Sequence, residues 1–247
     1  QTTSEETNTS SETLASSIIS ELSSNLTSTS PSRLNEFSVR KATKELSNSL
    51  SSSQIEQITE AARKAVNDSN LGESENLILL MPKIIEGAQS KLASIGLSDS
   101  DEAIKVINVI VNSMVKSVNG RNQYLPDNSV DSGLTAYETI FKKITTASVS
   151  NLDEAGLSSS DIGKASSALV GTVVSSLGSS GISSSELGGS IEKITSGAVD
   201  SLDQIAGFDV SSLGSAIDNI TGGATAALGD ISVTGFSSDN LTYMVEK

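Results

Sequence analysis

The chain has 247 residues, a net charge of −14, 3% aromatic residues, and neither cysteine nor histidine. The lack of cysteine excludes disulfides and thiolate chemistry. The lack of both residue types excludes Ser-His-Asp and Cys-His catalytic arrangements and the usual zinc sites. The excess of 30 acidic over 16 basic residues argues against a nucleic-acid partner, whose phosphates would require a basic stripe.

The first 53 residues are polar and rich in serine. Residues 1–12 are predicted to form a polar tether, and residues 13–53 to hold two Ser-rich helical segments separated by Pro31, which breaks helices. Ile18 and Leu22 lie four residues apart in the first segment, with Ile19 beside them. Because the numbering starts at Gln1 rather than Met, we expect a processed N-terminus from which a secretion signal has been removed.

From residue 54 onward the chain repeats every 26 residues or so, and each copy reads as one amphipathic helix. Apolar residues also recur three and seven positions before an anchor residue and eight and eleven positions after it, which places them on one face of a helix. The anchors of the seven copies are Ile58, Ile84, Ile110, Ile144, Leu169, Ile194 and Ile220. The sequence therefore predicts stacked helices rather than strands.

Two further features recur at fixed positions in the repeat. The residue three positions after each anchor is small, as at Gly87, Gly197 and Gly223, which predicts that a neighbouring helix passes close by. A glycine followed by an apolar residue closes most copies, as at Gly96 and Gly156. Glycine in this place stops a helix in the left-handed conformation, so short links and antiparallel sequential helices are expected.

One insertion and one proline interrupt the repeat. The segment 120–133 lengthens one step to 34 residues and is predicted to be a loop that divides the array into lobes 54–119 and 134–247. Within it, Arg121 and Tyr124 are the candidate contact residues, and the alternative is a plain spacer. Pro82 is expected to kink its helix or to delay the helix's regular start.

Sequence motifs for catalysis or cofactor binding are absent. No serine lies in a Gly-x-Ser-x-Gly elbow, and no phosphate-binding loop is present, so we expect no enzyme activity and no cofactor. Asp99, Asp101, Asp127 and Asp131 match no EF-hand, and aspartate is common at helix caps. No apolar run approaches the length of a transmembrane segment.

The last residues, 235–247, match the turn and the opening of another repeat. An uncapped array presents an apolar end that is prone to associate. We expect either that further repeats follow or that Leu241, Met244 and Val245 pack on another subunit. Ile18, Ile19 and Leu22 are the candidate partner surface, and such head-to-tail contacts can propagate into a filament.

The segments ITSGAVDSLDQIAGF and ITGGATAALGDISVTGFSSDNLTYMVEK resemble Ser/Gly-rich helical-repeat surface lipoproteins of Gram-negative bacteria. The resemblance is clearest over residues 143–247. It implies export, a lipid-anchored or secreted N-terminus and no catalysis, although no lipobox cysteine precedes Gln1. Silk-type helical repeats share the low-aromatic, Ser-rich composition but usually carry fewer charges than the 19% found in this chain.

The prediction for the fold is an all-α array of antiparallel amphipathic helices, an α-solenoid or an elongated bundle. The prediction for function is a non-enzymatic, secreted or cell-surface structural protein that self-associates into a filament, fibre or surface layer. It would have no nucleic-acid partner and no transmembrane segment, and would carry a lipid anchor if the resemblance holds. The alternative is a monomeric adhesin or protein-binding repeat module.

Overall fold

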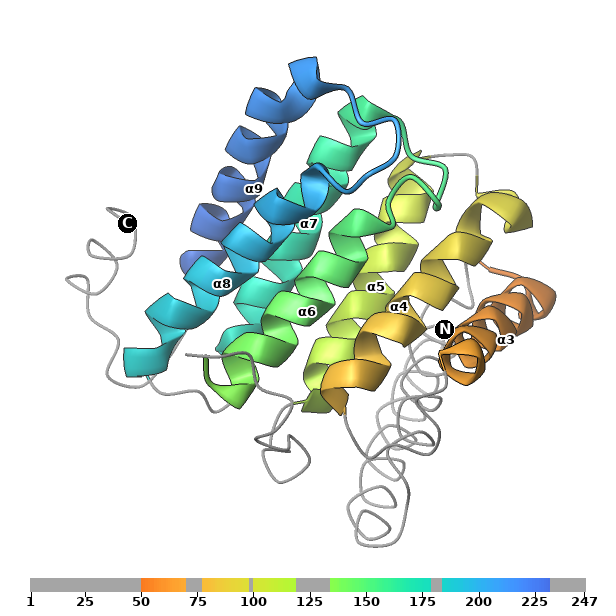
Figure 1. The fold of residues 1–247 in the computed structure, drawn as a ribbon, viewed down its shortest axis with the longest axis horizontal. Coiled ribbons are helices and arrows are strands. Elements are labelled where there is room, and N and C mark those ends of the chain that lie inside the picture. The colour runs from red at the N-terminus through yellow and green to blue at the C-terminus, as the bar shows by residue number, and fades with distance from the viewer. Residues whose placement is uncertain (1–49, 70–76, 98–99, 119–133, 179–183, 232–247) are drawn as a thin grey trace, which may run out of the picture.

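The computed structural model describes residues 50–69, 77–97, 100–118, 134–178 and 184–231, and most of these residues are helical (Figure 1). They form α3 (Ser52–Asp68), α4 (Leu77–Leu92), α5 (Ser100–Val118), α6 (Ala136–Ser150), α7 (Ser159–Leu177), α8 (Ser184–Leu202) and α9 (Leu213–Leu228). Two short 3-10 helices, η1 (Ala93–Ile95) and η4 (Val210–Ser212), lie in the links. No strand occurs in these ranges, and the predicted all-α class is confirmed. The tether 1–12 and nearly all of segment 13–53 lie outside the described residues.

The helices pack in two layers (Figure 1). One row consists of α3, α4, α6 and α8, and the other of α5, α7 and α9. The closest packing joins α6 with α8 and α7 with α9, so row neighbours are two helices apart in the sequence. The sequence repeat of one helix is therefore assembled in space as pairs of helices, one in each row.

Contacts along α5 and α7 give the direction of the helices within a row. The Thr172 hydroxyl donates to Asn108 Oδ1 at 3.3 Å, and one turn later the Ser176 hydroxyl lies 3.4 Å from Asn112 Oδ1. Both residue numbers increase together, so α5 and α7 run parallel. The glycines of α7 and α8 give the same parallel register for α7 with α9 and for α6 with α8.

Helix α3 departs from this rule. Gln54, near its start, donates from Nε2 to the Ile95 carbonyl oxygen at 2.9 Å, just beyond the end of α4. Ala61 and Ala65, further along α3, lie against Gly87 in the middle of α4. The two helices are therefore antiparallel. Helix α3 packs beside α4, its neighbour in the sequence, and lengthens that row.

The predicted anchors form the core between the two rows. All seven are buried, with exposed fractions of 4% or less. Residues eight positions after an anchor are also buried at Leu92, Leu152, Leu177, Leu202 and Leu228. Rings contribute little to this core: Phe141 is fully buried and stacks on half-buried Tyr137, with 5.9 Å between the ring centroids. A core of aliphatic side chains fits the close spacing of the helices.

The helix ends follow the predicted turn chemistry where the structure describes them. Gly96, Gly156 and Gly207 have φ of 84°, 84° and 73°, in the left-handed region. After Gly156, the amide of buried Leu157 donates to the Leu152 carbonyl at 3.3 Å, which satisfies a carbonyl at the helix end. The turns predicted at Gly181 and Gly235 lie outside the described residues.

Capping boxes begin two of the helices. The Thr135 hydroxyl accepts from the Glu138 amide at 3.2 Å, and the Glu138 carboxylate accepts from the Thr135 amide at 2.7 Å. Ser51 and Gln54 form the same reciprocal pair at the start of α3. Each pair satisfies two amides that have no partner inside the helix.

Pro82 lies inside α4, which already runs helically from Leu77. Of the two predicted effects, the delayed start is thus wrong: the helix precedes the proline. The flanking apolar residues hold it there, since Ile78, Leu80 and Met81 are fully buried.

Both rows cross the predicted division between lobes 54–119 and 134–247. In one row, Gln89 of α4 donates from Nε2 to the Ser148 carbonyl of α6 at 2.8 Å. In the other, the asparagines of α5 meet the hydroxyls of α7. The buried residues on either side of segment 120–133 belong to one hydrophobic core.

Candidate interaction surfaces

The residues predicted from sequence to make contacts all lie outside the part of the chain that the structure describes. This applies to the contact-loop residues Arg121 and Tyr124. It also applies to the assembly-surface residues Ile18, Ile19, Leu22, Leu241, Met244 and Val245. Their roles stay predictions, and the surfaces considered below come from the described helices.

Neighbouring helices of a row contact each other through small residues. A Cβ atom placed on Gly223 of α9 would lie 2.7 Å from the Ser167 hydroxyl oxygen of α7 and would overlap the Ser167 carbonyl. A Cβ on Gly87 would lie 2.6 Å from the Ala61 carbonyl oxygen. At Gly197 the nearest atoms, on Lys142 and Thr146 of α6, are 3.1 Å away. At Gly87 and Gly223 the small position of the repeat is therefore a point of close approach between helices, as predicted.

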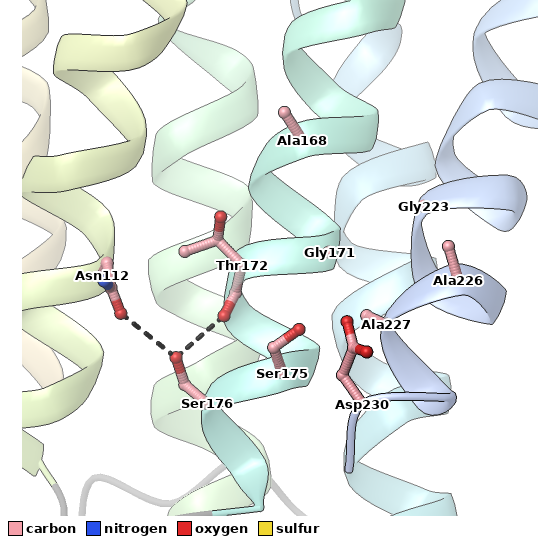
Figure 2. Close-up of a pocket in the computed structure, with 10 residues that line it drawn as sticks. All are labelled: Asn112, Ala168, Gly171, Thr172, Ser175, Ser176, Gly223, Ala226, Ala227 and Asp230. Atoms are coloured by element: carbon pink, nitrogen blue, oxygen red, sulfur yellow. Dashed lines mark hydrogen bonds between the residues drawn. The ribbon is translucent and has the colours of Figure 1, made fainter.

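The outer side of the α5–α7–α9 row carries a polar groove lined by uncharged side chains and Asp230 (Figure 2). The groove has a volume of about 540 Å³ and runs over Gly171 and Gly223, where the missing side chains leave a furrow. The Ser176 hydroxyl, beside Asn112, donates to the Thr172 carbonyl at 2.8 Å. Such a surface offers amide and hydroxyl groups but no paired acid and base.

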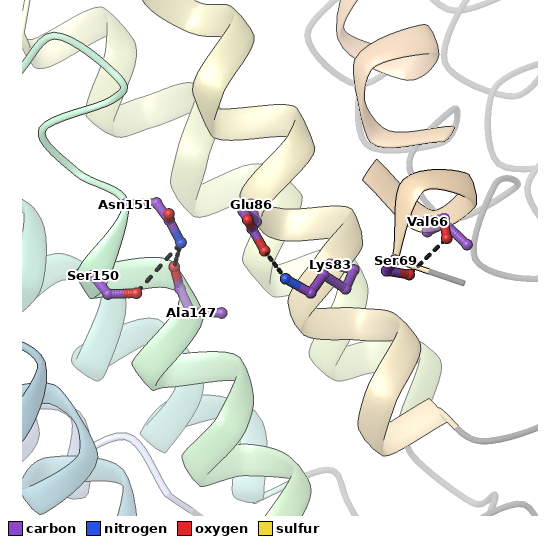
Figure 3. A network of polar contacts seen from close by, with 7 residues as sticks. All are labelled: Val66, Ser69, Lys83, Glu86, Ala147, Ser150 and Asn151. Carbon is purple, nitrogen blue, oxygen red and sulfur yellow. Dashed lines mark hydrogen bonds and ion pairs between the residues drawn. The ribbon is translucent and has the colours of Figure 1, made fainter. Parts of the chain in front are cut away.

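A second groove lies on the outer side of α4, α6 and α8 and is more charged. It is lined by Leu79, Pro82, Lys83, Glu86, Lys142, Lys143, Thr146, Ala147, Ser150, Asn151, Asp200 and Gln204, with Ile78 at its base. Lys83 pairs with Glu86 at 2.6 Å, and both side chains are 41% exposed (Figure 3). Because solvent screens an exposed pair, it contributes little to stability. Across the groove, Asn151 Nδ2 donates to the Ala147 carbonyl at 2.7 Å (Figure 3).

Among the described residues, three buried side chains have an oxygen atom without a hydrogen-bond partner: Gln89 Oε1, Ser166 Oγ and Ser190 Oγ. Gln89 and Ser166 are fully enclosed, on α4 and α7. None of these residues lines either groove. Their unpartnered oxygens therefore reflect tight packing between helices and do not indicate a binding site.

Two carboxylates near the link between α6 and α7 have shifted pKa values. Partial burial, and then the charges of Asp153 and Glu86, raise the pKa of Glu154 above its ordinary value. A hydrogen bond from the Ser158 hydroxyl is the main cause that lowers the pKa of Asp161, and the ion pair with Lys164 adds to it. Glu154 lies in the link between α6 and α7, and Asp161 lies in the first turn of α7. Their neighbours in the fold explain both pKa shifts.

Two further kinds of feature are absent from the described residues. Among the described residues no three acidic side chains gather closely enough to hold a metal ion. Within the same ranges no helix is both long and apolar enough to cross a membrane. The grooves present hydroxyl and amide groups, and the faces of the helices are suited to packing against other helices.

No protein-family model and no curated protein sequence matches this chain.

Proposed function

We propose that this protein is a non-enzymatic structural protein of the cell surface or the exterior, and that its helical rows associate with those of other copies. The observation that carries the proposal is the close packing between neighbouring helices of a row. Close contacts at small residues recur at Gly87, in antiparallel orientation, and at Gly197 and Gly223, in parallel orientation. A packing unit that recurs in one chain can recur between chains, since repeat arrays bury their surface only against neighbours.

The composition supports a structural role as well. The chain has no histidine or cysteine, and the two grooves of the described surface hold amides, hydroxyls, carboxylates and lysine side chains. These groups bind and pack, but they do not supply a general base close to neutral pH. The lipid anchor and the surface location rest on the resemblance to helical-repeat surface lipoproteins.

Self-association is tested by light scattering and negative-stain electron microscopy of the purified chain over a wide concentration range. We expect oligomers whose mass rises with concentration, and rods or sheets on the grid. A chain that stays monomeric at high concentration contradicts the proposal. Mass spectrometry of the N-terminus of protein from its native cells tests the anchor, because an acyl chain adds a defined mass.

The second candidate is a monomeric adhesin or protein-binding module. The groove beside Asn112 and Ser176 favours it, because amide and hydroxyl groups line an open furrow of about 540 Å³. Glycan and peptide arrays probed with the labelled monomer test this alternative. Specific binding that is lost in Asn112→Ala, with no change in oligomeric state, would support it over assembly.

A further inference from the structure

Neighbouring helices within a row are not joined in the same way along the array. Between α7 and α9 the backbones come close: a Cβ placed on Gly223 would overlap the Ser167 carbonyl, and one on Gly171 would lie 3.4 Å from the Gly223 carbonyl oxygen. A Cβ on Gly197 of α8 would likewise lie 3.4 Å from the Lys142 carbonyl oxygen of α6. The helix pair α6 and α7 is therefore held to the pair α8 and α9 by close backbone contacts in both rows.

The pair α4 and α5 is held to the pair α6 and α7 by side chains instead. Helices α5 and α6 contain no glycine, and Gly87 of α4 faces α3. Longer polar side chains cross this plane, which we call the seam, in the contacts of Gln89 with Ser148, Asn108 with Thr172, and Asn112 with Ser176. Packing across the seam is less extensive than packing between the pairs α6/α7 and α8/α9.

The polar contacts of the seam are weak. The Thr172 and Ser176 hydroxyls lie 3.3 and 3.4 Å from the asparagine Oδ1 atoms, whereas a well-formed O–H···O bond spans about 2.7–2.8 Å. The Ser176 hydroxyl also has a nearer acceptor, the Thr172 carbonyl oxygen at 2.8 Å. In the other row, the fully buried Gln89 amide bonds Ser148 through Nε2, but its Oε1 has no partner among the described residues. A buried acceptor without a partner disfavours the closed seam, because water would satisfy that atom after opening.

Solvent reaches the seam from both outer sides. A furrow of about 360 Å³ runs along α5 beside Thr172 of α7. The charged groove on the other side, of about 670 Å³, is lined largely by α4 and α6. The apolar core between the rows is continuous through the seam, so that core, rather than the polar contacts, keeps the two sides together.

We propose that the seam divides the molecule into two cooperative units, and that α3, α4 and α5 unfold as one unit while α6, α7, α8 and α9 stay folded. The stability of a repeat array is a sum of units and nearest-neighbour contacts, so cooperativity fails first at the weakest contact between units. The unit α6–α9 is the more stable of the two, because close backbone contacts join its helices in both rows. A structural protein built in this way can lengthen under load at α3–α5 and refold on the half that stays intact. This inference goes beyond self-association and does not depend on it, because it concerns single molecules in dilute solution.

Hydrogen exchange of the dilute, unmodified chain, in urea below the unfolding transition, tests the two units. We expect the slowest amides of α4 and α5 to share one opening reaction. Those of α6, α7 and α8 should share a second, with exchange at least tenfold slower. A single opening reaction for all five helices overturns the proposal.

Two matched valine variants give an independent test. The Thr172 hydroxyl contacts Asn108 across the seam at 3.3 Å, and the Thr146 hydroxyl contacts the Gly197 carbonyl within the second unit at 3.4 Å. Both threonines are half-buried, and valine keeps their shape. Thr146→Val should speed exchange in α8 by about 2- to 10-fold and leave α4 and α5 unchanged, because the Thr146 contact persists when the first unit opens. Thr172→Val should speed exchange in both units alike, because either opening breaks the seam.

The outcomes separate this inference from the proposed function. Equal acceleration of α4, α5 and α8 by Thr146→Val overturns the division at the seam. A chain that stays monomeric, but in which Thr146→Val acts on the second unit alone, contradicts self-association and supports the two units. A chain that forms oligomers and has one opening reaction supports self-association and overturns the two units.

Discussion

At the residue scale, adjacent glycines in α9 have different roles, although the sequence presents them as a pair. Gly223 touches the backbone of α7, while Gly222 faces open space among the described residues. The sequence could predict the first from its recurrence at the small position of the repeat. It could not predict the second, because an exposed glycine and a contact glycine look the same until the rotation of the helix is known.

This difference gives the first prediction. Gly223→Leu should lower the free energy of unfolding by about 1–3 kcal/mol, because the added side chain overpacks the joint with Ser167. Gly222→Leu, the matched control, should raise it by up to about 1 kcal/mol through helix propensity. Urea denaturation of dilute protein measures both. Equal effects at the two positions would show that α7 and α9 are not in close contact.

Glu154 gives a second prediction at the same scale. Partial burial and the charges of Asp153 and Glu86 raise its pKa, so the folded state holds the Glu154 proton more tightly than the unfolded chain does. Its ionisation therefore costs stability above the unfolded pKa, and this cost disappears as the pH falls below that value. Glu154→Gln should stabilise the protein at pH 7 and have no such effect under acidic conditions.

Melting temperatures of Glu154→Gln and the unmodified chain at pH 7 and at about pH 3 test this sign, the low value being below the ordinary pKa of glutamate. Asp161→Asn is the control with the opposite trend, because the hydrogen bond from Ser158 lowers the pKa of Asp161. Removal of that carboxylate should destabilise the protein at pH 7 and lose its effect in acid. Identical pH trends for the two variants would contradict the assignment.

At the element scale, the turns were the most predictable part of the fold. A helix that ends on glycine followed by an apolar residue has a local cause, and Gly96, Gly156 and Gly207 all take the left-handed conformation. The caps at Thr135 and Ser158 are local too. In contrast, the place of α3 against α4 depends on long-range packing of Gln54 and Gly87, which no local pattern encodes.

The third prediction concerns one such turn. Gly207→Ala should lower the free energy of unfolding by about 1 kcal/mol, because a side chain strains the left-handed backbone at φ 73°. No heavy atom of the described residues lies within 4 Å of a Cβ placed on Gly207, so no steric effect adds to the strain. Gly214→Ala, equally open but helical, is the control and should be neutral or stabilising. Chemical denaturation that shows no loss in Gly207→Ala would mean that the turn adopts another conformation.

At the scale of the whole molecule, the repeat predicted helices and a buried anchor for each, and all seven anchors are buried. The two-row arrangement was not predictable from the spacing. A period of one helix is compatible with a single file or with alternating rows, and the choice depends on how each helix rotates about its axis. The assembly surface predicted from sequence stays a prediction at this scale, because its residues lie outside the described part of the chain.

The last prediction follows from the rows. Helices α6 and α7 have row neighbours on both sides, whereas α9 has α7 on one side and an exposed outer face on the other. Stability in a repeat array is a sum of units and nearest-neighbour contacts, so in dilute protein the amides of α9 should exchange faster than those of α6 and α7. If self-association covers the exposed side of α9, its exchange should slow as the protein concentration rises. The helices α6 and α7 should show little change, because their neighbours are present in the monomer.

Hydrogen exchange followed by mass spectrometry at two concentrations measures this difference. A uniform slowing across all the helices would place the contact elsewhere than on α9.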